Sequence, residues 1–369
     1  SAVVLDSVSG LAQGFERFEA PLADPQNGGI GVESWAAEEV LRRVERWLDQ
    51  RDRSRPFFLW AHFFDPHQPY LAAAELLRRT RNDPYLAEVA RMDRALGRLT
   101  ARLKDEGLLE RTFLLVAGDH GEALGDHGES THGAACFDPT LKVPLLLRYP
   151  GGWGAGERSG EIVSVADICP TLLEAMGLTP PADLDGLSLY HRSVPPRRGV
   201  YFESYYGFLN FGWSPLAGWV DHDGKYLLSS RPQFFDLNRD PGETTDLLAE
   251  KEAVVRRDRQ AIEALRARPS LALEADPPPG EEALEAIRSL GYAASGDPQA
   301  VAALPLEAPG RPSPTQGLEE LRRILQAVQM EKNGKRGPAI ELLQQVVAAN
   351  PANGYAQELL GRFLFFSKD

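Results

Sequence analysis

Two adjacent residues, Asp119 and His120, form the pair in this sequence that is best suited to bind a metal ion. They follow the apolar run TFLLVAG and precede the glycine-rich stretch GEALGDHG. A short apolar run predicts a buried strand, and ligands collect at the carboxyl ends of strands in an open α/β sheet. A carboxylate beside an imidazole at such a place predicts a metal site, although one such pair could also cap a loop.

The distribution of histidines strengthens the prediction of a site. Five of the seven histidines lie between His62 and His132, and histidine is both a common metal ligand and a group that titrates near neutrality. His67 stands in the segment DPHQPY, where two prolines favour an extended loop. His62 lies inside an apolar run and is predicted to be a core residue, while His127 is predicted to shape a turn.

Composition excludes several classes of function. The chain has 369 residues, 43% of them hydrophobic, and a net charge of -13, which argues against non-specific binding to nucleic acid or to an anionic membrane. The two cysteines cannot form a disulfide framework. The longest apolar run, FFLWAHFF, is too short to span a bilayer. No signal peptide is recognisable, but a chain that opens on SAVVL resembles one cut inside a strand, so this says nothing about location.

The order of predicted elements indicates an α/β protein. Apolar runs that predict strands alternate with amphipathic segments that predict helices, which indicates a mostly parallel sheet between helices. The predicted strands are 2–5, 56–64, 112–117 and 143–149, and the predicted helices are 34–50, 84–107 and 167–177. Ser34, Asp83 and Asp167 are the expected helix caps. The run at 56–64 is continuously apolar, which is typical of a strand buried on both faces.

Three further regions follow the predicted α/β core, which occupies residues 1–194. Short aromatic strands joined by turns predict an antiparallel meander in 195–268, closed by a helix over about 245–267. Residues 269–316 are rich in proline and read as a linker with one short helix near 281–291. Residues 317–369 are helical, with small residues at spacings similar to a tetratricopeptide repeat. These helices either begin a repeat array or dock on the main body.

Five blocks of this sequence, in order, resemble those of the sulfatase family in the alkaline phosphatase superfamily. They are FFLWAHFFDPHQPY, VAGDHGEALGDHGESTHG, DPTLKVPLLLRYPG, VADICPTLLEAMGL with LDGLSL, and FFDLNRDPGETTDLLA. The likeness covers roughly residues 1–265. It implies an alkaline-phosphatase-like sheet, incomplete at its N-terminal side, and cleavage of sulfate esters.

The resemblance also assigns roles to individual residues. Asp119 and His120 match the later half of the family's metal set, which usually holds Ca²⁺, with Mn²⁺ or Zn²⁺ as other possibilities. The cation offsets charge on the sulfuryl oxygens. His67 matches a histidine that binds the sulfate and assists the leaving oxygen, a task suited to imidazole. His132 stands where relatives often have a lysine that contacts the sulfate, so it is a second catalytic candidate.

Two parts of the family pattern are missing from this sequence. It contains no adjacent Asp-Asp pair and no C/S-x-P-x-R motif, from which the formylglycine nucleophile is made. An Asp-His pair alone supplies too few ligands for a cation that takes six to eight oxygens. We therefore expect the nucleophile and the remaining ligands upstream of this chain, and we expect the chain alone to be inactive.

Two alternatives to a sulfatase stay open. One is a phosphate or phosphonate ester hydrolase of the same superfamily, in which a cation would likewise offset the negative charge of the ester. The other is a non-catalytic scaffold that presents the helical repeats to a protein partner. The expected substrate is a small-molecule or carbohydrate sulfate ester. The resemblance favours an extracytoplasmic location, periplasmic or secreted, although likeness of fold alone determines neither cellular location nor substrate.

Overall fold

The computed structural model describes residues 10–21, 34–68, 70–191, 193–196, 198–268 and 305–366, which fall into two compact units. Of these, unit 1 takes the residues up to Leu114 together with Arg148–Ala155, and unit 2 takes Leu115–Leu147, 156–268 and 305–366. The predicted strand at 2–5, the predicted helix near 281–291 and most of the predicted linker lie outside the described residues. No helix within the described ranges is both long and apolar enough to cross a membrane.

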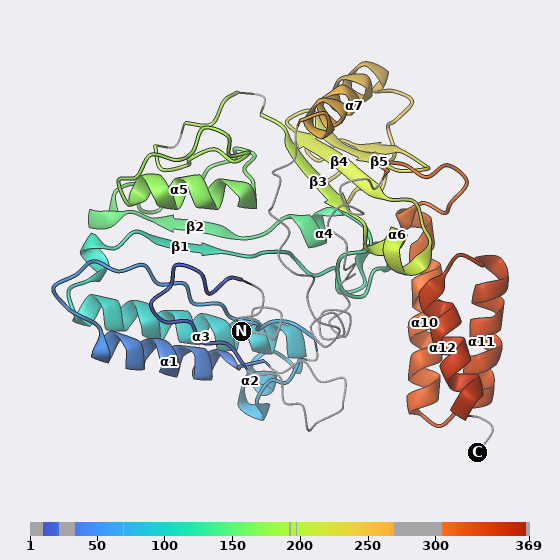
Figure 1. The fold of residues 1–369 in the computed structure, drawn as a ribbon, viewed down its shortest axis with the longest axis horizontal. Coiled ribbons are helices and arrows are strands. Elements are labelled where there is room, and N and C mark those ends of the chain that lie inside the picture. Colours follow the sequence, from blue (N-terminus) through green and yellow to red (C-terminus); the bar gives the residue numbers. More distant parts are fainter. Residues whose placement is uncertain are drawn as a thin grey trace. The chain divides into compact units, whose positions relative to one another are not determined.

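Unit 1 is built on two amphipathic helices, α1 (Ala37–Gln50) and α3 (Pro84–Asp105), with the short α2 (Ala74–Arg79) beside α3 (Figure 1). α1 and α3 pack together through apolar stripes that include Leu41, Leu48 and Leu99. The cap at Asp83 is confirmed, because its carboxylate accepts a hydrogen bond from the Leu86 amide at 3.0 Å. The predicted cap at Ser34 is wrong, since α1 begins at Ala37 without a side-chain cap.

Residues 56–64 of unit 1 are extended, but the structure assigns no strand to them. Phe57, Leu59 and Phe63 pack against the α1–α3 core, whereas the alternate residues Phe58 and Trp60 remain 48% and 47% exposed. The prediction of a strand buried on both faces is therefore wrong for the described structure. A continuous apolar run reveals that a segment can be covered on two sides, but not whether both sides are covered.

Two strands that were predicted from apolar runs, β1 (Leu114–Ala117) and β2 (Leu145–Arg148), pair as a two-stranded sheet. The short helix α4 (Asp138–Leu141) precedes β2, and α5 (Ile168–Ala175) follows it. α5 is entered through a 3₁₀ turn, η7 (Val165–Asp167), which Ser164 caps. Further 3₁₀ turns are η4 (Leu109–Arg111), η5 (Asp126–Gly128) and η6 (Pro150–Gly152).

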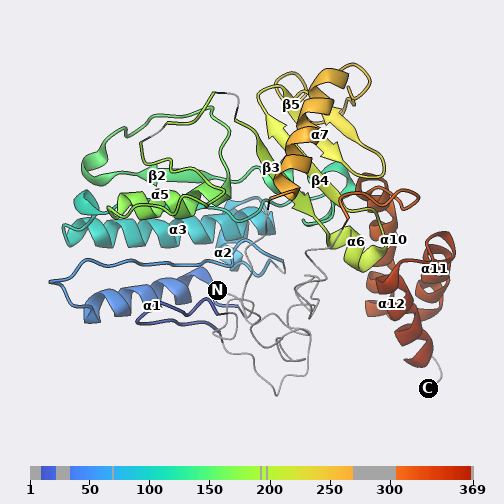
Figure 2. The same ribbon diagram turned by 45° about the horizontal axis from the view of Figure 1, so that its top comes forward.

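Unit 2 contains the predicted antiparallel meander. Its strands are β3 (Val200–Ser204), β4 (Leu216–Asp221), β5 (Gly224–Leu228) and β6 (Gln233–Phe235), and they pair in chain order. Every pair is antiparallel, which confirms the prediction. α7 (Glu252–Arg266) lies across β4 and β5 (Figure 2). β5 is buried throughout because its alternate side chains enter two different apolar clusters.

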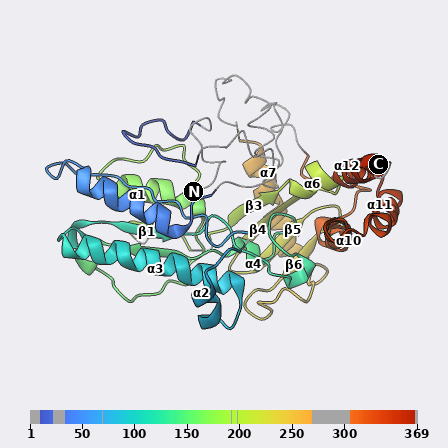
Figure 3. The same cartoon turned by 90° about the horizontal axis from the view of Figure 1, so that it is seen from below.

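The C-terminal helices of unit 2 are α10 (Pro314–Lys332), α11 (Arg336–Ala349) and α12 (Gly354–Phe365). They pack in sequence, and α12 contacts α6 (Tyr206–Phe211) of the same unit (Figure 3). Their apolar residues share one core with Phe211 and Trp213. The Asn350 amide donates to the Phe211 carbonyl at 2.9 Å. Of the two arrangements expected for these helices, docking on the body is the one observed, and their likeness to tetratricopeptide repeats stays a prediction.

Candidate functional site

A loop of unit 2, residues 119–142, carries three of the four predicted site residues, and we call it the site loop. It leaves β1 and returns through α4 to β2. Short backbone hydrogen bonds fold it on itself, including Gly121 N to the Thr140 carbonyl and Ala123 N to the Thr131 carbonyl, both 2.8 Å. A Cβ at Gly121 would lie 2.1 Å from the Pro139 oxygen, so this close approach requires glycine.

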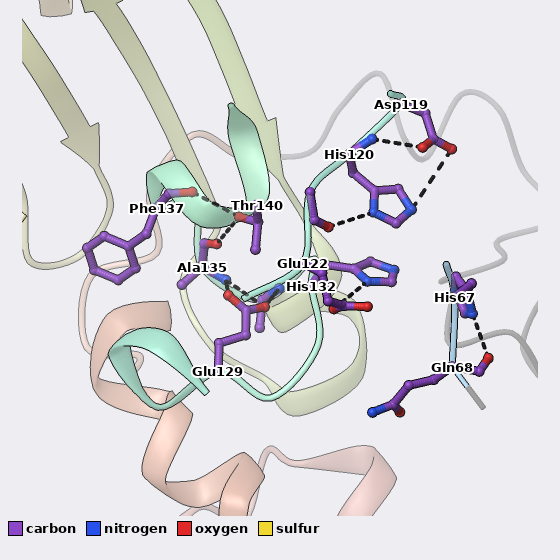
Figure 4. Close-up of polar contacts among 12 residues, drawn as sticks. His67, Gln68, Asp119, His120, Glu122, Glu129, His132, Ala135, Phe137 and Thr140 are labelled. Carbon is purple, nitrogen blue, oxygen red and sulfur yellow. Dashed lines mark hydrogen bonds and ion pairs between the residues drawn. The ribbon is translucent and has the colours of Figure 1, made fainter. Parts of the chain in front are cut away.

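Asp119 and His120 lie directly after β1, where the predicted metal site should begin (Figure 4). The Asp119 side chain is 73% exposed, and its Oδ2 lies 3.9 Å from His120 Nε2. His120 Nδ1 lies 2.9 Å from the Gly121 carbonyl oxygen. A carbonyl accepts but cannot donate, so this contact places the ring proton on Nδ1 and the lone pair on Nε2, the nitrogen on the Asp119 side.

His132 lies against His120, with the two ring centroids 3.9 Å apart and the planes inclined by 28°. Its Nδ1 is 3.2 Å from a carboxylate oxygen of Glu122, whose side chain is only 4% exposed (Figure 4). A buried carboxylate on one ring nitrogen fixes the orientation of the ring and directs the other nitrogen away from it. The structure thus brings Asp119, His120 and His132 together on one loop.

A buried carboxylate, Glu129, holds the returning half of the site loop. Glu129 is 1% exposed, and its Oε1 accepts a hydrogen bond from the Ala134 amide at 2.7 Å. Oε2 lies 3.3 Å from the Ala135 amide. Burial raises the pKa of Glu129 to about 7, because a low-dielectric surrounding disfavours the charged form, and the two amides offset part of that cost.

The end of the site loop is anchored to the meander by a buried ion cluster. Lys225 of β5 has no exposed side chain and lies 2.8 Å from the Asp138 carboxylate of α4. It also pairs with Glu243, whose side chain is equally buried. Glu243 accepts a hydrogen bond from the Asp138 amide at 2.6 Å. The pKa of Glu243 is raised by burial and held down by Lys225, so the three groups stabilise one another.

The fourth predicted residue, His67, belongs to unit 1. Its ring stacks on Phe64 with a centroid distance of 4.3 Å, and Nδ1 lies 2.7 Å from the Gln68 carbonyl oxygen. This contact fixes the tautomer and leaves Nε2 as the nitrogen that could exchange a proton with a substrate. That His67 acts together with the three residues of the site loop stays a prediction.

The donor set partly fits a divalent metal. Asp119 offers a carboxylate oxygen and His120 an imidazole nitrogen, both of which bind such ions. Within the described ranges, however, no group of three or more His, Cys, Asp or Glu side chains is placed to hold a metal ion. The two residues therefore account for part of a coordination sphere, and a complete site requires ligands in addition to these.

Comparison with solved structures identifies the fold. A protein solved in complex with its substrate D-glucosamine-2-N,6-O-disulfate aligns with a TM-score of 0.54 at 19% identity, over 64% of this chain and 70% of that one. The phosphonate monoester hydrolase of Agrobacterium radiobacter aligns with a TM-score of 0.50 at 25% identity, over 63% and 60%. The chain therefore shares the α/β fold of these structures, and its sulfatase homologues place it in the alkaline phosphatase superfamily.

Sequence comparison identifies the family within that superfamily. The Sulfatase family model matches residues 7–178, and the model for the N-sulphoglucosamine sulphohydrolase C-terminal region matches 126–268. The arylsulfatase of Clostridium perfringens is 26% identical over 266 residues, which cover 59% of this chain and 54% of that protein. The chain belongs to the sulfatase family, and it spans about half the length of this relative.

The burial of two carboxylates of the site was not predicted from the sequence, from which Glu122 was expected to face solvent or to support the site rather than to bind the metal itself. Glu122 and Glu129 are acidic residues in a glycine-rich loop, a context that usually indicates solvent exposure, yet both side chains are buried. The signal available was indirect: the small residues of THGAA follow Glu129 and leave backbone amides open to a nearby acceptor. The contact between the Glu129 carboxylate and these amides forms only in the folded loop, so it cannot be recognised from the sequence.

Proposed function

We propose that this chain forms part of a hydrolase that cleaves sulfate esters. The observation that carries the proposal is the grouping of Asp119, His120 and His132 at the end of β1, within the segment that the Sulfatase model matches. An exposed carboxylate beside stacked imidazoles suits an anionic ligand only when a cation lies between them, because a carboxylate alone repels sulfate.

In this proposal Asp119 and His120 hold part of a divalent metal site, with Ca²⁺ as the first expectation and Mn²⁺ or Zn²⁺ as others. The metal would neutralise charge on the sulfuryl oxygens as the ester bond breaks. Sulfatases as a family use a divalent metal together with a formylglycine. We propose that the formylglycine comes from residues outside this sequence, which has no C/S-x-P-x-R motif.

The residues of the chain itself have separate tasks in the proposed reaction. Glu122 accepts from Nδ1 of His132 and thereby orients the ring. In the imidazolium form of His132, in which both ring nitrogens carry a proton, Nε2 would donate a hydrogen bond to a sulfuryl oxygen. The Gly121 carbonyl keeps His120 in the tautomer whose Nε2 can bind a metal. We assign to His67 the transfer of a proton to the leaving oxygen, for which an imidazole is suited near neutral pH.

The proposed substrate is a small-molecule or carbohydrate sulfate ester, in keeping with a structural relative solved with a sulfated glucosamine as its substrate. We further propose an extracytoplasmic location, periplasmic or secreted. The alternative reaction within the superfamily, phosphonate or phosphate ester hydrolysis, is favoured by one observation, the fold shared at 25% identity with a phosphonate monoester hydrolase.

The test compares esters and variants in parallel. The parent protein encoded by the full reading frame and this 369-residue chain are assayed with 4-nitrophenyl sulfate and with a 4-nitrophenyl phosphonate ester. We expect sulfate turnover from the parent protein alone, with a loss of about 100-fold or more for Asp119→Asn. Preference for the phosphonate would favour the alternative, and turnover by the short chain would refute our assignment of the nucleophile.

The loop provides its own control. Asp126 and His127 repeat the Asp-His order, and the Asp126 carboxylate likewise accepts from the following amide, as Asp119 does. Asp126→Asn removes the same charge from the same loop, but at a residue that has no role in the proposed metal site. It should therefore leave turnover and Mn²⁺ binding within about twofold of the parent. Equal effects of Asp119→Asn and Asp126→Asn would contradict a metal site at Asp119.

A further inference from the structure

A cavity of about 320 Å³ lies in unit 2, on the side of the site loop where α10 begins. Its walls come from η5 of the site loop, from β6, from the turn at 243–246 and from the first residues of α10. Asp119, His120 and His132 are not among its lining residues. The cavity is therefore separate from the proposed metal site, although both are built on the same loop.

One wall of the cavity is aromatic. Phe137 and Phe235 are buried, and their ring centroids are 6.0 Å apart. The ring of His127 stacks on Phe137 with a centroid distance of 3.7 Å and an interplanar angle of 6°. All three residues line the cavity. Phe137 and Phe235 are only 6% and 2% exposed, so His127, which covers one face of Phe137, is the least buried ring of this wall. The wall therefore offers a small aromatic surface, which suits a ligand with a small apolar face.

The rim of the cavity is polar. Arg231, Gln233 and Gln316 line it, and their side chains form no hydrogen bond or ion pair with any residue in the described part of the chain. The Gln233 carboxamide oxygen is buried without a partner among those residues. Most buried polar groups in proteins are hydrogen-bonded, so the Gln233 oxygen offers an acceptor to a ligand that carries a donor. The exposed side chains of Arg231 and Gln316 offer further hydrogen-bonding groups beside it.

The charges around the cavity argue against a strongly anionic ligand. Arg231 is a cation on the rim, but Asp246 is an anion on it, and its Oδ1 already accepts bonds from the Phe234 and Leu248 amides. The Glu243 charge is met by Lys225. One cation and one further carboxylate leave little net attraction for sulfate or phosphate, so a neutral polar ligand fits better.

We propose that this cavity binds the neutral pyranose ring of a saccharide. The C–H face of such a ring would lie on the aromatic wall, and its hydroxyl groups, which donate and accept, would bond Gln233, Gln316 and Arg231. A volume of about 320 Å³ is at the lower end of ligand pockets, which matches a single ring. The proposal does not rest on sulfate hydrolysis, because binding here involves none of the proposed catalytic residues.

Saturation-transfer NMR and calorimetry on the full chain test the proposal with three neutral probes: the methyl β-glycosides of glucose, galactose and N-acetylglucosamine. We expect at least one to bind saturably. Gln233→Leu should weaken that binding at least tenfold, because it removes two hydrogen-bonding groups while keeping the volume. Gln316→Trp should also abolish binding, by filling the cavity, and thermal unfolding checks that each variant is folded.

The matched control is Gln326→Leu, which makes the same change at an exposed position of α10 and should leave binding unchanged. Three outcomes would overturn the proposal. They are no binding of any probe to the parent chain, binding that survives both Gln233→Leu and Gln316→Trp, and displacement of the bound glycoside by millimolar inorganic sulfate. The last result would make the cavity an anion site.

Discussion

The substitution Glu129→Gln tests whether burial of Glu129 under the site loop makes its ionised form destabilising. Glu129 is almost fully buried beneath the loop, where it accepts from the Ala134 amide. Glutamine keeps the shape and one acceptor oxygen but carries no charge at any pH. It therefore resembles the protonated form of the glutamic acid.

The size of the effect follows from the pKa. Burial raises the pKa of Glu129 from 4.5 to about 7, and each pKa unit corresponds to about 1.4 kcal/mol. The folded protein therefore binds a proton that the unfolded chain has released between these two values, and its stability falls as the pH rises through this window. Ionisation of Glu129 should cost about 3 kcal/mol of unfolding free energy by pH 8, and nothing below pH 4.

The assay is urea unfolding from pH 4.5 to pH 8, followed by the fluorescence of the tryptophans of unit 2, of which Trp213 is fully buried. The parent and Glu129→Gln should be about equally stable at pH 4.5. At pH 8 the variant should be more stable by up to about 3 kcal/mol. Glu341→Gln, on the exposed face of α11, is the matched control for the loss of one acidic side chain.

A loss of stability in Glu129→Gln that does not depend on pH would contradict this prediction. If Glu129→Gln is less stable than the parent by the same amount at every pH, the backbone amides bind the charged carboxylate strongly enough to outweigh its burial. Our account of the site loop would then be refuted, because ionised Glu129 would be a net stabilising group.

Two further predictions concern how the tail and the meander hold the site loop. A Cβ at Gly317 of α10 would lie 2.3 Å from the Trp213 ring, so Gly317→Ala should lower stability in thermal unfolding by about 1–3 kcal/mol. Gly361→Ala on α12, where nothing lies within 4 Å, should raise it by up to about 1 kcal/mol, and equal effects would contradict the docking of α10. Lys225→Met leaves the buried carboxylate of Glu243 and the partly exposed one of Asp138 without a cation and should cost about 3–5 kcal/mol in urea unfolding. Lys225→Met combined with Glu243→Gln should recover part of that loss, and a single variant as stable as the parent would contradict the role of the cluster.

Local sequence pattern was enough to predict several helices and strands of this protein. The apolar stripe of α1, the Asp83-Pro84 start of α3 and the short aromatic strands of the meander each lie within one stretch of sequence. Helix and strand periodicity depends only on neighbouring residues, so it can be read without knowing the fold. The place of the Asp119-His120 pair, at the end of an apolar run, was predictable for the same reason.

The tertiary structure alone decided which groups are buried and what they contact. The run at 56–64 is covered on one side in the described structure, Glu129 is enclosed by amides five and six residues further on, and Lys225 meets carboxylates from two distant segments. These outcomes depend on which surfaces meet when the chain closes. No short stretch of sequence contains that information, because the free energy of a buried charge depends on partners far away in the chain.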